Sequence, residues 1–144
     1  MVYQIYFSGH VRRESAAEPV AGDAMTAVKI CKMYDVTGLT LFSEGSFMTV
    51  IEGPRTAVTA IYEFYRTDGR MSDVKVMVSR ESDTREFNDF RIGFRHWDFS
   101  DACSGAFQLN ERSLMSSLPT NPSTELRVLT NTFARVTALQ VCAA

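Results

Sequence analysis

Two short apolar segments separated by a turn constrain the fold of this chain more than any other feature. Residues 36–42 and 46–51 are rich in apolar and β-branched side chains, and Ser43-Glu44-Gly45 lies between them. Runs of this length and composition are typical of strands, and a short connection with glycine is typical of a hairpin. The middle of the chain is therefore predicted to be a β-hairpin.

The segments around this hairpin alternate in kind. Periodicity predicts further strands at residues 2–8, 74–78 and 91–94, and helices at residues 23–34 and 54–65. Gly53-Pro54 ends the second hairpin strand and places proline at a helix start. The order is β-α-β-β-α-β with one more strand. It predicts an α+β, ferredoxin-like βαββαββ sheet with two helices on one face.

The composition changes after Ser100. Residues 106–144 contain only five charged side chains and many serines and threonines. Asn121-Pro122 fits the N-cap and first position of a final helix. We therefore expect a domain at residues 1–100 and a C-terminal helical extension at residues 101–144, packed on the other sheet face within the same compact unit.

The predicted final helix carries a narrow apolar seam at spacings of three and four residues. Its members are Leu126, Leu129, Phe133, Val136 and Leu139. A stripe of this width needs a surface to cover it. Packing on the bare sheet face of the same domain is the simpler interpretation, and a contact with a second copy or a protein partner is the alternative.

Composition excludes several classes of function. With 15 basic and 17 acidic residues the net charge is −2, which does not suit a polybasic nucleic-acid binder. No apolar run is long enough to span a membrane, and two histidines make a His-rich metal site improbable. Three scattered cysteines are typical of reduced thiols, so a cytoplasmic location is expected.

Three enzyme hypotheses can be weighed against simpler interpretations. Ser8-Gly9-His10-Val11-Arg12-Arg13 resembles an anion-binding loop but lacks the glycine spacing of such a cradle. Cys31 lies on an apolar helix face and is better explained as an inert buried thiol. The carboxylates Glu81, Asp83, Glu86 and Asp89 alternate with arginines, which favours a solvated loop. We expect no enzyme, with an acylphosphatase-like hydrolase as an alternative.

His96 and Trp97 follow the last predicted strand. Such a pair could stack on a ligand. A tryptophan at this position is more often a plug of the core or an interface residue, so Trp97 joins the seam as a candidate contact with a partner.

An ordered set of short motifs is more specific than any of these. The set is Tyr6-Phe7-Ser8, Val36-Thr37-Gly38-Leu39-Thr40-Leu41-Phe42, Phe47-Met48-Thr49-Val50-Ile51-Glu52-Gly53-Pro54, Asp68-Gly69-Arg70, Arg85-Glu86-Phe87, Phe90 and Gly93-Phe94. In order and spacing, residues 2–97 resemble the BLUF family, blue-light sensors that use FAD. The resemblance implies the same ferredoxin-like fold, with FAD between the two helices.

The resemblance assigns roles to single positions. Tyr6 matches the tyrosine that donates an electron and a proton to the excited flavin. Thr49 stands where the family has the glutamine that rearranges between tyrosine and flavin. A hydroxyl lacks the separate C=O and NH₂ of an amide and cannot switch between two hydrogen-bond patterns. The family's photoswitch is therefore expected to be absent.

The flavin cradle also departs from the family pattern. Ile30 and Cys31 replace asparagines that bond the ring edge, and Tyr65 replaces a residue that packs on one ring face. Other departures are Asp23, Met71, Phe90 and Ile92, whereas Asp68 and Arg70 match. Each unpaired polar group on the buried ring edge would cost about 1–3 kcal/mol.

The sequence therefore predicts a BLUF-fold regulatory module that acts through protein contacts or as a homodimer, without FAD. A true FAD photoreceptor with a divergent pocket is the alternative. In that case Tyr6 would still donate, Cys31 or Thr49 would supply substitute hydrogen bonds, and Asp68 and Arg70 would hold the ribityl-phosphate side.

Overall fold

One mixed β-sheet organises the chain. The computed structural model describes residues 1–11, 28–43, 45–67, 71–94, 106–109, 111–119 and 122–143, and six strands within them form a sheet in the order β4-β1-β3-β2-β5-β6. The strands are β1 (Val2–Val11), β2 (Thr37–Ser43), β3 (Ser46–Gly53), β4 (Met71–Ser82), β5 (Phe90–Phe94) and β6 (Ala106–Gln108). The helices are α2 (Arg55–Thr67), α3 (Glu111–Ser117) and α4 (Thr124–Ala143), and residues 28–33 are also helical. The predicted ferredoxin-like arrangement is confirmed.

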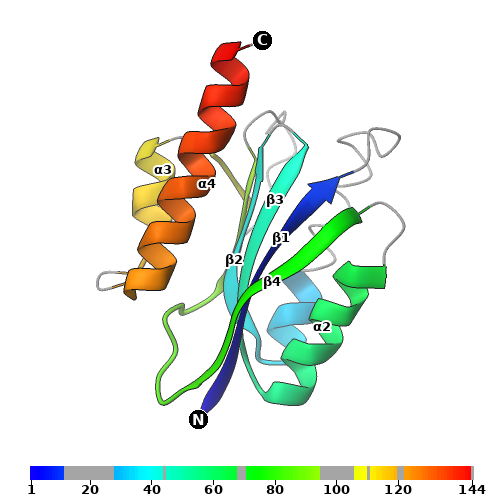
Figure 1. The fold of residues 1–144 in the computed structure, drawn as a ribbon. Coiled ribbons are helices and arrows are strands. Elements are labelled where there is room, and N and C mark those ends of the chain that lie inside the picture. The colour runs from blue at the N-terminus through cyan, green and yellow to red at the C-terminus, as the bar shows by residue number, and fades with distance from the viewer. Residues whose placement is uncertain are drawn as a thin grey trace.

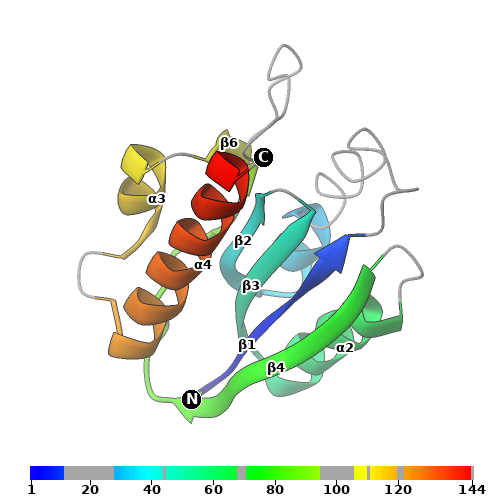
Figure 2. The ribbon, with the colours of Figure 1, turned by 45° about the horizontal axis from the view of Figure 1, so that its top comes forward.

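Helices cover both faces of the sheet (Figure 1). The helical segment 28–33 and α2 lie on one face, and α3 and α4 lie on the other, as the turned view also shows (Figure 2). Each face has its own core. The α2-side core contains Ile5, Phe7, Cys31, Val36, Phe47, Ile51, Val58, Tyr65, Phe90 and Ile92. The α4-side core contains Tyr6, Leu39, Leu41, Met48, Val50, Phe87, Leu109, Leu114 and Leu126.

The predicted hairpin forms the centre of the sheet together with β1. Strands β2 and β3 pair antiparallel, with Phe42 opposite Phe47 and Ser43 opposite Ser46. Gly45 in the connection has a φ of 78°, a conformation that glycine adopts without steric cost. Strand β1 pairs antiparallel with both β3 and β4, whereas β5 and β6 extend the sheet in parallel from β2.

Several predicted boundaries are wrong. Strand β1 continues to Val11, so residues 8–11 lie in a paired strand and not in an anion-binding loop. Strand β4 is longer at both ends than the alternating residues indicated. The short strand β6 falls in the segment expected to be only helical, where it pairs with β5.

The final helix begins later than predicted. Its first residue is Thr124, and the Oγ of Ser123 accepts a hydrogen bond from the backbone N of Leu126 at 3.2 Å. A serine that bonds the third amide of a helix is its N-cap. Ser123 therefore caps α4, and the cap predicted at Asn121-Pro122 is two residues too early.

The apolar seam of α4 packs on its own sheet. Leu126 is fully buried in the α4-side core, and Leu129 and Phe133 pack against that core. The simpler interpretation of the seam is therefore confirmed for these three side chains, which are already covered within the chain. Trp97 and the side chain of Val136 lie outside the described part of the structure. Among the described helices, none has the length and apolarity needed to cross a membrane.

Candidate functional site

The alternation of β1 sends neighbouring side chains to opposite faces of the sheet. Ile5 and Phe7 lie in the α2-side core, whereas Tyr6 lies in the α4-side core with none of its surface exposed. Gln4 is fully buried and hydrogen-bonds on the same side as Tyr6. Because successive residues of a strand point in opposite directions, Tyr6 faces away from α2.

The other residues expected around a flavin do not share this face. Cys31 and Tyr65 lie together in the α2-side core. Thr49 stands between Phe47 and Ile51 of that core and pairs with Phe7 of β1. The residue of β1 beside Thr49 is therefore a phenylalanine, and the structure separates Tyr6 from Cys31, Thr49 and Tyr65.

The remaining expected positions are placed as follows. Ile30 is 40% exposed at the helical segment 28–33. Asp68 and Arg70 lie outside the described residues.

The hydroxyl of Thr49 already has a hydrogen-bond partner. The hydroxyls of Thr40 and Thr49 lie 3.0 Å apart, both fully buried. Burial raises the pKa of the Cys31 thiol to about 12, so the thiol is neutral at pH 7. Cys31 is thus buried, as its apolar helix face predicted, and a thiol that is not ionised is a poor nucleophile.

Aromatic rings fill the layer between the sheet and α2. The Phe7 ring lies 5.2 Å from the rings of both Tyr62 and Tyr65, with edge-to-face geometry. The ring of Phe47 lies 6.2 Å from Phe7 and 5.8 Å from Tyr65. Contacts of this kind add stability beyond the area that they bury, so these rings form an ordinary aromatic core.

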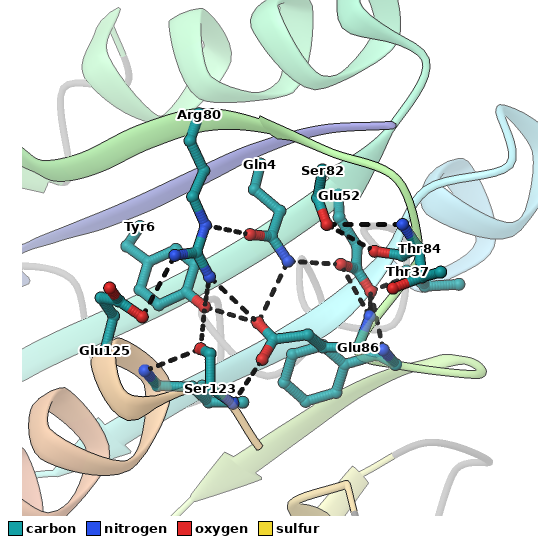
Figure 3. A network of polar contacts seen from close by, with 12 residues as sticks. Gln4, Tyr6, Thr37, Glu52, Arg80, Ser82, Thr84, Glu86, Ser123 and Glu125 are labelled. Carbon is teal, nitrogen blue, oxygen red and sulfur yellow. Dashed lines mark hydrogen bonds and ion pairs between the residues drawn. The ribbon is translucent and has the colours of Figure 1, made fainter. Parts of the chain in front are cut away.

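A polar network occupies the opposite face around Tyr6 (Figure 3). The Tyr6 hydroxyl donates to Oε2 of Glu86 at 2.6 Å. The Nε2 of Gln4 donates to Oε2 of Glu52 at 2.7 Å and to Oε2 of Glu86 at 3.0 Å. Gln4 therefore bridges two carboxylates, and Tyr6 is tied to one of them.

Arg80 of β4 neutralises part of this negative charge. Its Nε donates to Oε1 of Gln4 at 2.8 Å, and its guanidinium lies 3.1 Å from the carboxylate of Glu125 and 3.8 Å from that of Glu86. The guanidinium also lies over the Tyr6 ring at 5.6 Å from its centroid. Arg80 thus contacts the sheet, the β4–β5 connection and α4 at once.

Glu52 anchors the connection between β4 and β5. Its carboxylate is fully buried and accepts hydrogen bonds from the backbone N of Glu86 and of Phe87, both at 2.7 Å. Charge-assisted bonds from backbone amides are among the stronger ones in proteins. Glu52 therefore sets the path of the segment that carries Glu86.

The ionisation of Tyr6 and Glu86 reflects this environment. Burial, and next the hydrogen bond to Glu86, raise the pKa of Tyr6 well above its ordinary value. Burial also opposes the charged form of Glu86, but hydrogen bonds from Tyr6, Ser123 and Gln4 outweigh it and lower the pKa of Glu86. At neutral pH the pair is a phenol donating to a carboxylate.

The lowered pKa of Glu86 predicts how stability depends on pH. Its contribution is present above the ordinary glutamate pKa of about 4.3 and is lost as pH falls through the lower, folded-state value. Urea unfolding of the wild type and of Glu86→Gln should therefore show a smaller difference between the two proteins at pH 3 than at pH 7. A difference that stays constant over this range would contradict the assignment.

The acidic cluster of the sequence divides into two kinds of residue. Glu81 near the end of β4, and Asp83 and Asp89 in the β4–β5 connection, are exposed as predicted, although Glu81 belongs to a strand and not to a loop. That interpretation is wrong for Glu86, whose side chain is only 13% exposed because Tyr6, Gln4 and the start of α4 surround it. The sequence signal for this site is the alternation of Gln4, Tyr6 and Ser8 with Ile5 and Phe7.

Known proteins share this architecture. Residues 1–93 match the family model described as sensors of blue-light using FAD. The BLUF protein BlrB in its dark state is 26% identical with a TM-score of 0.57, over 65% of this chain and 73% of that one. No curated protein matches the sequence.

Longer proteins match more of the chain. Klebsiella pneumoniae BlrP1, in a complex with manganese and cyclic diGMP, has a TM-score of 0.70 at 17% identity over 91% of this chain. A bacterial light-regulated adenylyl cyclase has a TM-score of 0.65 at 14% identity over 99% of it. The chain spans about a third of each of these two proteins (32% and 36%). Because the family model covers well over half of the sequence, the chain belongs to the BLUF family of blue-light sensors that use FAD.

Proposed function

We propose that this chain is a BLUF-fold signalling module that acts through protein contacts and neither holds FAD nor photoswitches. The observation that carries the proposal is the direction of Tyr6, the residue that matches the family's electron donor. Its hydroxyl bonds Glu86 in the α4-side core, whereas a flavin between the helices would lie on the α2 side. Phe7, which does face that side, has no hydroxyl to donate.

Two positions that match the family's ring-edge residues also offer poor partners to the polar edge of a flavin. Thr49 already bonds Thr40, and a buried neutral Cys31 thiol is a weak donor and acceptor. Each ring atom left unpaired costs about 1–3 kcal/mol. The rings of Phe7, Phe47 and Tyr65 already pack on one another where a flat ring system would need space. These residues do not fit FAD.

The spectrum of the purified protein tests this proposal. We expect no bound flavin after expression, or after incubation with excess FAD and gel filtration, and no change under blue light. Released flavin should be measured by fluorescence after denaturation. A yellow protein with stoichiometric bound flavin would contradict the flavin-free proposal. It would favour the divergent photoreceptor, which the family match and the retained Asp68 and Arg70 support.

Variants make the same experiment more specific. Thr49→Gln restores the family's glutamine, but we expect it to show no light response because its neighbour on β1 is Phe7. Adding Phe7→Tyr supplies a phenol on the α2 side and is the matched comparison. A light response in Thr49→Gln that Tyr6→Phe abolishes would show that Tyr6 serves a flavin after all.

Protein contacts are the proposed means of action. In BlrP1 and the light-regulated cyclase the matched part is about a third of the chain, which supports a module that works beside other protein segments or in a homodimer. Light scattering of the purified chain would determine whether it is a dimer.

A further inference from the structure

The first turn of α4 is attached to the sheet by polar contacts that differ in kind from its apolar seam. The backbone N of Ser123 donates to Oε1 of Glu86 at 2.7 Å. The Oγ of Ser123 lies 3.2 Å from the Tyr6 hydroxyl, and Glu125 pairs with Arg80. Figure 3 shows Tyr6 of β1, Arg80 of β4 and Ser123 at the start of α4 grouped around Glu86.

We propose that Glu86 is a latch residue whose carboxylate determines whether α4 stays docked on the sheet. The latch consists of Tyr6, Arg80, Glu86, Ser123 and Glu125. In this proposal the tyrosine that matches the family's light-responsive residue is connected to the C-terminal helix. The inference deepens the proposed function, on which it rests, because it names α4 as the element that would regulate the module's protein contacts.

The latch needs an ionised carboxylate. One oxygen of Glu86 accepts from the amide of Ser123, and the other accepts from Tyr6 and Gln4. All of these partners donate in the present arrangement, so an amide or a protonated acid at residue 86 would face the Gln4 donor or would require the Tyr6 hydroxyl to turn and accept. A group that accepts on both oxygens satisfies the site without any such rearrangement.

The charged groups around Glu86 support the same state. Arg80 approaches from β4 and favours the carboxylate. Glu52 on β3 is separated from Glu86 by the bridging amide of Gln4, and Glu125 on α4 is paired with Arg80. Hydrogen bonds and the guanidinium of Arg80 therefore reduce the repulsion among Glu52, Glu86 and Glu125.

Release of α4 would uncover an apolar surface. Beneath the helices of this face lie Leu39, Leu41, Met48 and Val50, all 2% exposed or less. Exposure of these side chains to water costs free energy in proportion to their area. An undocked α4 would therefore leave these four side chains without their cover.

Hydrogen exchange measured residue by residue tests the latch on the full chain. In Glu86→Gln we expect the amides at residues 123–130 to exchange at least about tenfold faster than in the wild type, because the start of α4 loses its hydrogen bond to a charged group. The exchange rates of the amides of β1 and β3 should stay within about twofold of those in the wild type. Glu81→Gln is the matched control, because Glu81 is an exposed carboxylate of β4 outside the latch.

Two results would overturn the latch. One is that residues 123–130 of Glu86→Gln are protected from hydrogen exchange as well as the same residues of Glu81→Gln. The other is an equal loss of protection in β1 and β3, which would mean global destabilisation. Tyr6→Phe removes one donor and keeps the carboxylate, so it should accelerate exchange at residues 123–130 less than Glu86→Gln does. It replaces Glu86→Gln as the test variant if Glu86→Gln does not fold. A flavin-containing protein with a loosened α4 in Glu86→Gln would contradict only the flavin-free proposal.

Discussion

Glu52→Ala is expected to lower the free energy of unfolding by about 3–5 kcal/mol, one of the two largest effects for a single change in this chain. The Glu52 side chain has no exposed surface. It accepts hydrogen bonds from the side-chain amide of Gln4, from the backbone amides of Glu86 and Phe87, and, at 3.5 Å, from the hydroxyl of Thr37. Alanine would leave the backbone amides of Glu86 and Phe87 without this acceptor, would remove one of the two acceptors of the Gln4 amide, and would release the connection between β4 and β5.

Urea unfolding followed by circular dichroism measures this effect. Glu52→Gln should lose less stability, because its side-chain amide keeps one acceptor oxygen for these donors. Glu81→Gln removes an exposed carboxylate and should change stability by less than about 0.5 kcal/mol. Equal stabilities for Glu52→Ala and Glu81→Gln would mean that the donors find other partners and that Glu52 does not set the path of the connection.

Gly38→Ala is expected to cost about 3 kcal/mol or more, because backbone and not a side chain occupies the space that a methyl group needs. A Cβ at Gly38 would lie 1.9 Å from the carbonyl oxygen of Val50, and φ at Gly38 is 154°. Gly38 pairs with Ile51 across β2 and β3, so relief of this clash requires the two central strands to separate.

Gly45→Ala is the matched control for this change. Gly45 also has a positive φ, at 78°, but a Cβ there would meet its nearest atom at 3.9 Å. It should therefore cost only the conformational penalty of about 1–2 kcal/mol. Thermal or urea unfolding distinguishes the two variants. A smaller loss for Gly38→Ala than for Gly45→Ala would contradict the close approach of β2 and β3.

The fold could be predicted because its signals are local. The hairpin at residues 37–53 and the amphipathic α2 are both evident from spacing within a few residues. The three residues of β6 could not be predicted, because so short a segment has no period and pairs only after β5 is in place. The start of α4 was misplaced because Pro122 and Ser123 are both good starting residues.

The sequence predicts which positions belong to the candidate site, but not which way their side chains point. The family motif identified Tyr6, but a motif does not say which way a strand residue points, and the pairing of Phe7 with Thr49 decides that. The alternation in β1 carried this information. Glu86 looked like a loop charge because its partners, Gln4 and Tyr6, lie at the far end of the sequence.

The central place of β1 in the sheet has a consequence for how the chain is made. Strand β1 leaves the ribosome before either of its neighbours, and Val2 pairs with Ser82 of the much later β4. Until β4 has been synthesised, β1 has at least one open edge, and unpaired edges are prone to aggregate. Pairing over such a distance also slows folding. The speed of folding, and the need for chaperones during synthesis, should therefore depend on β4 more than on α4.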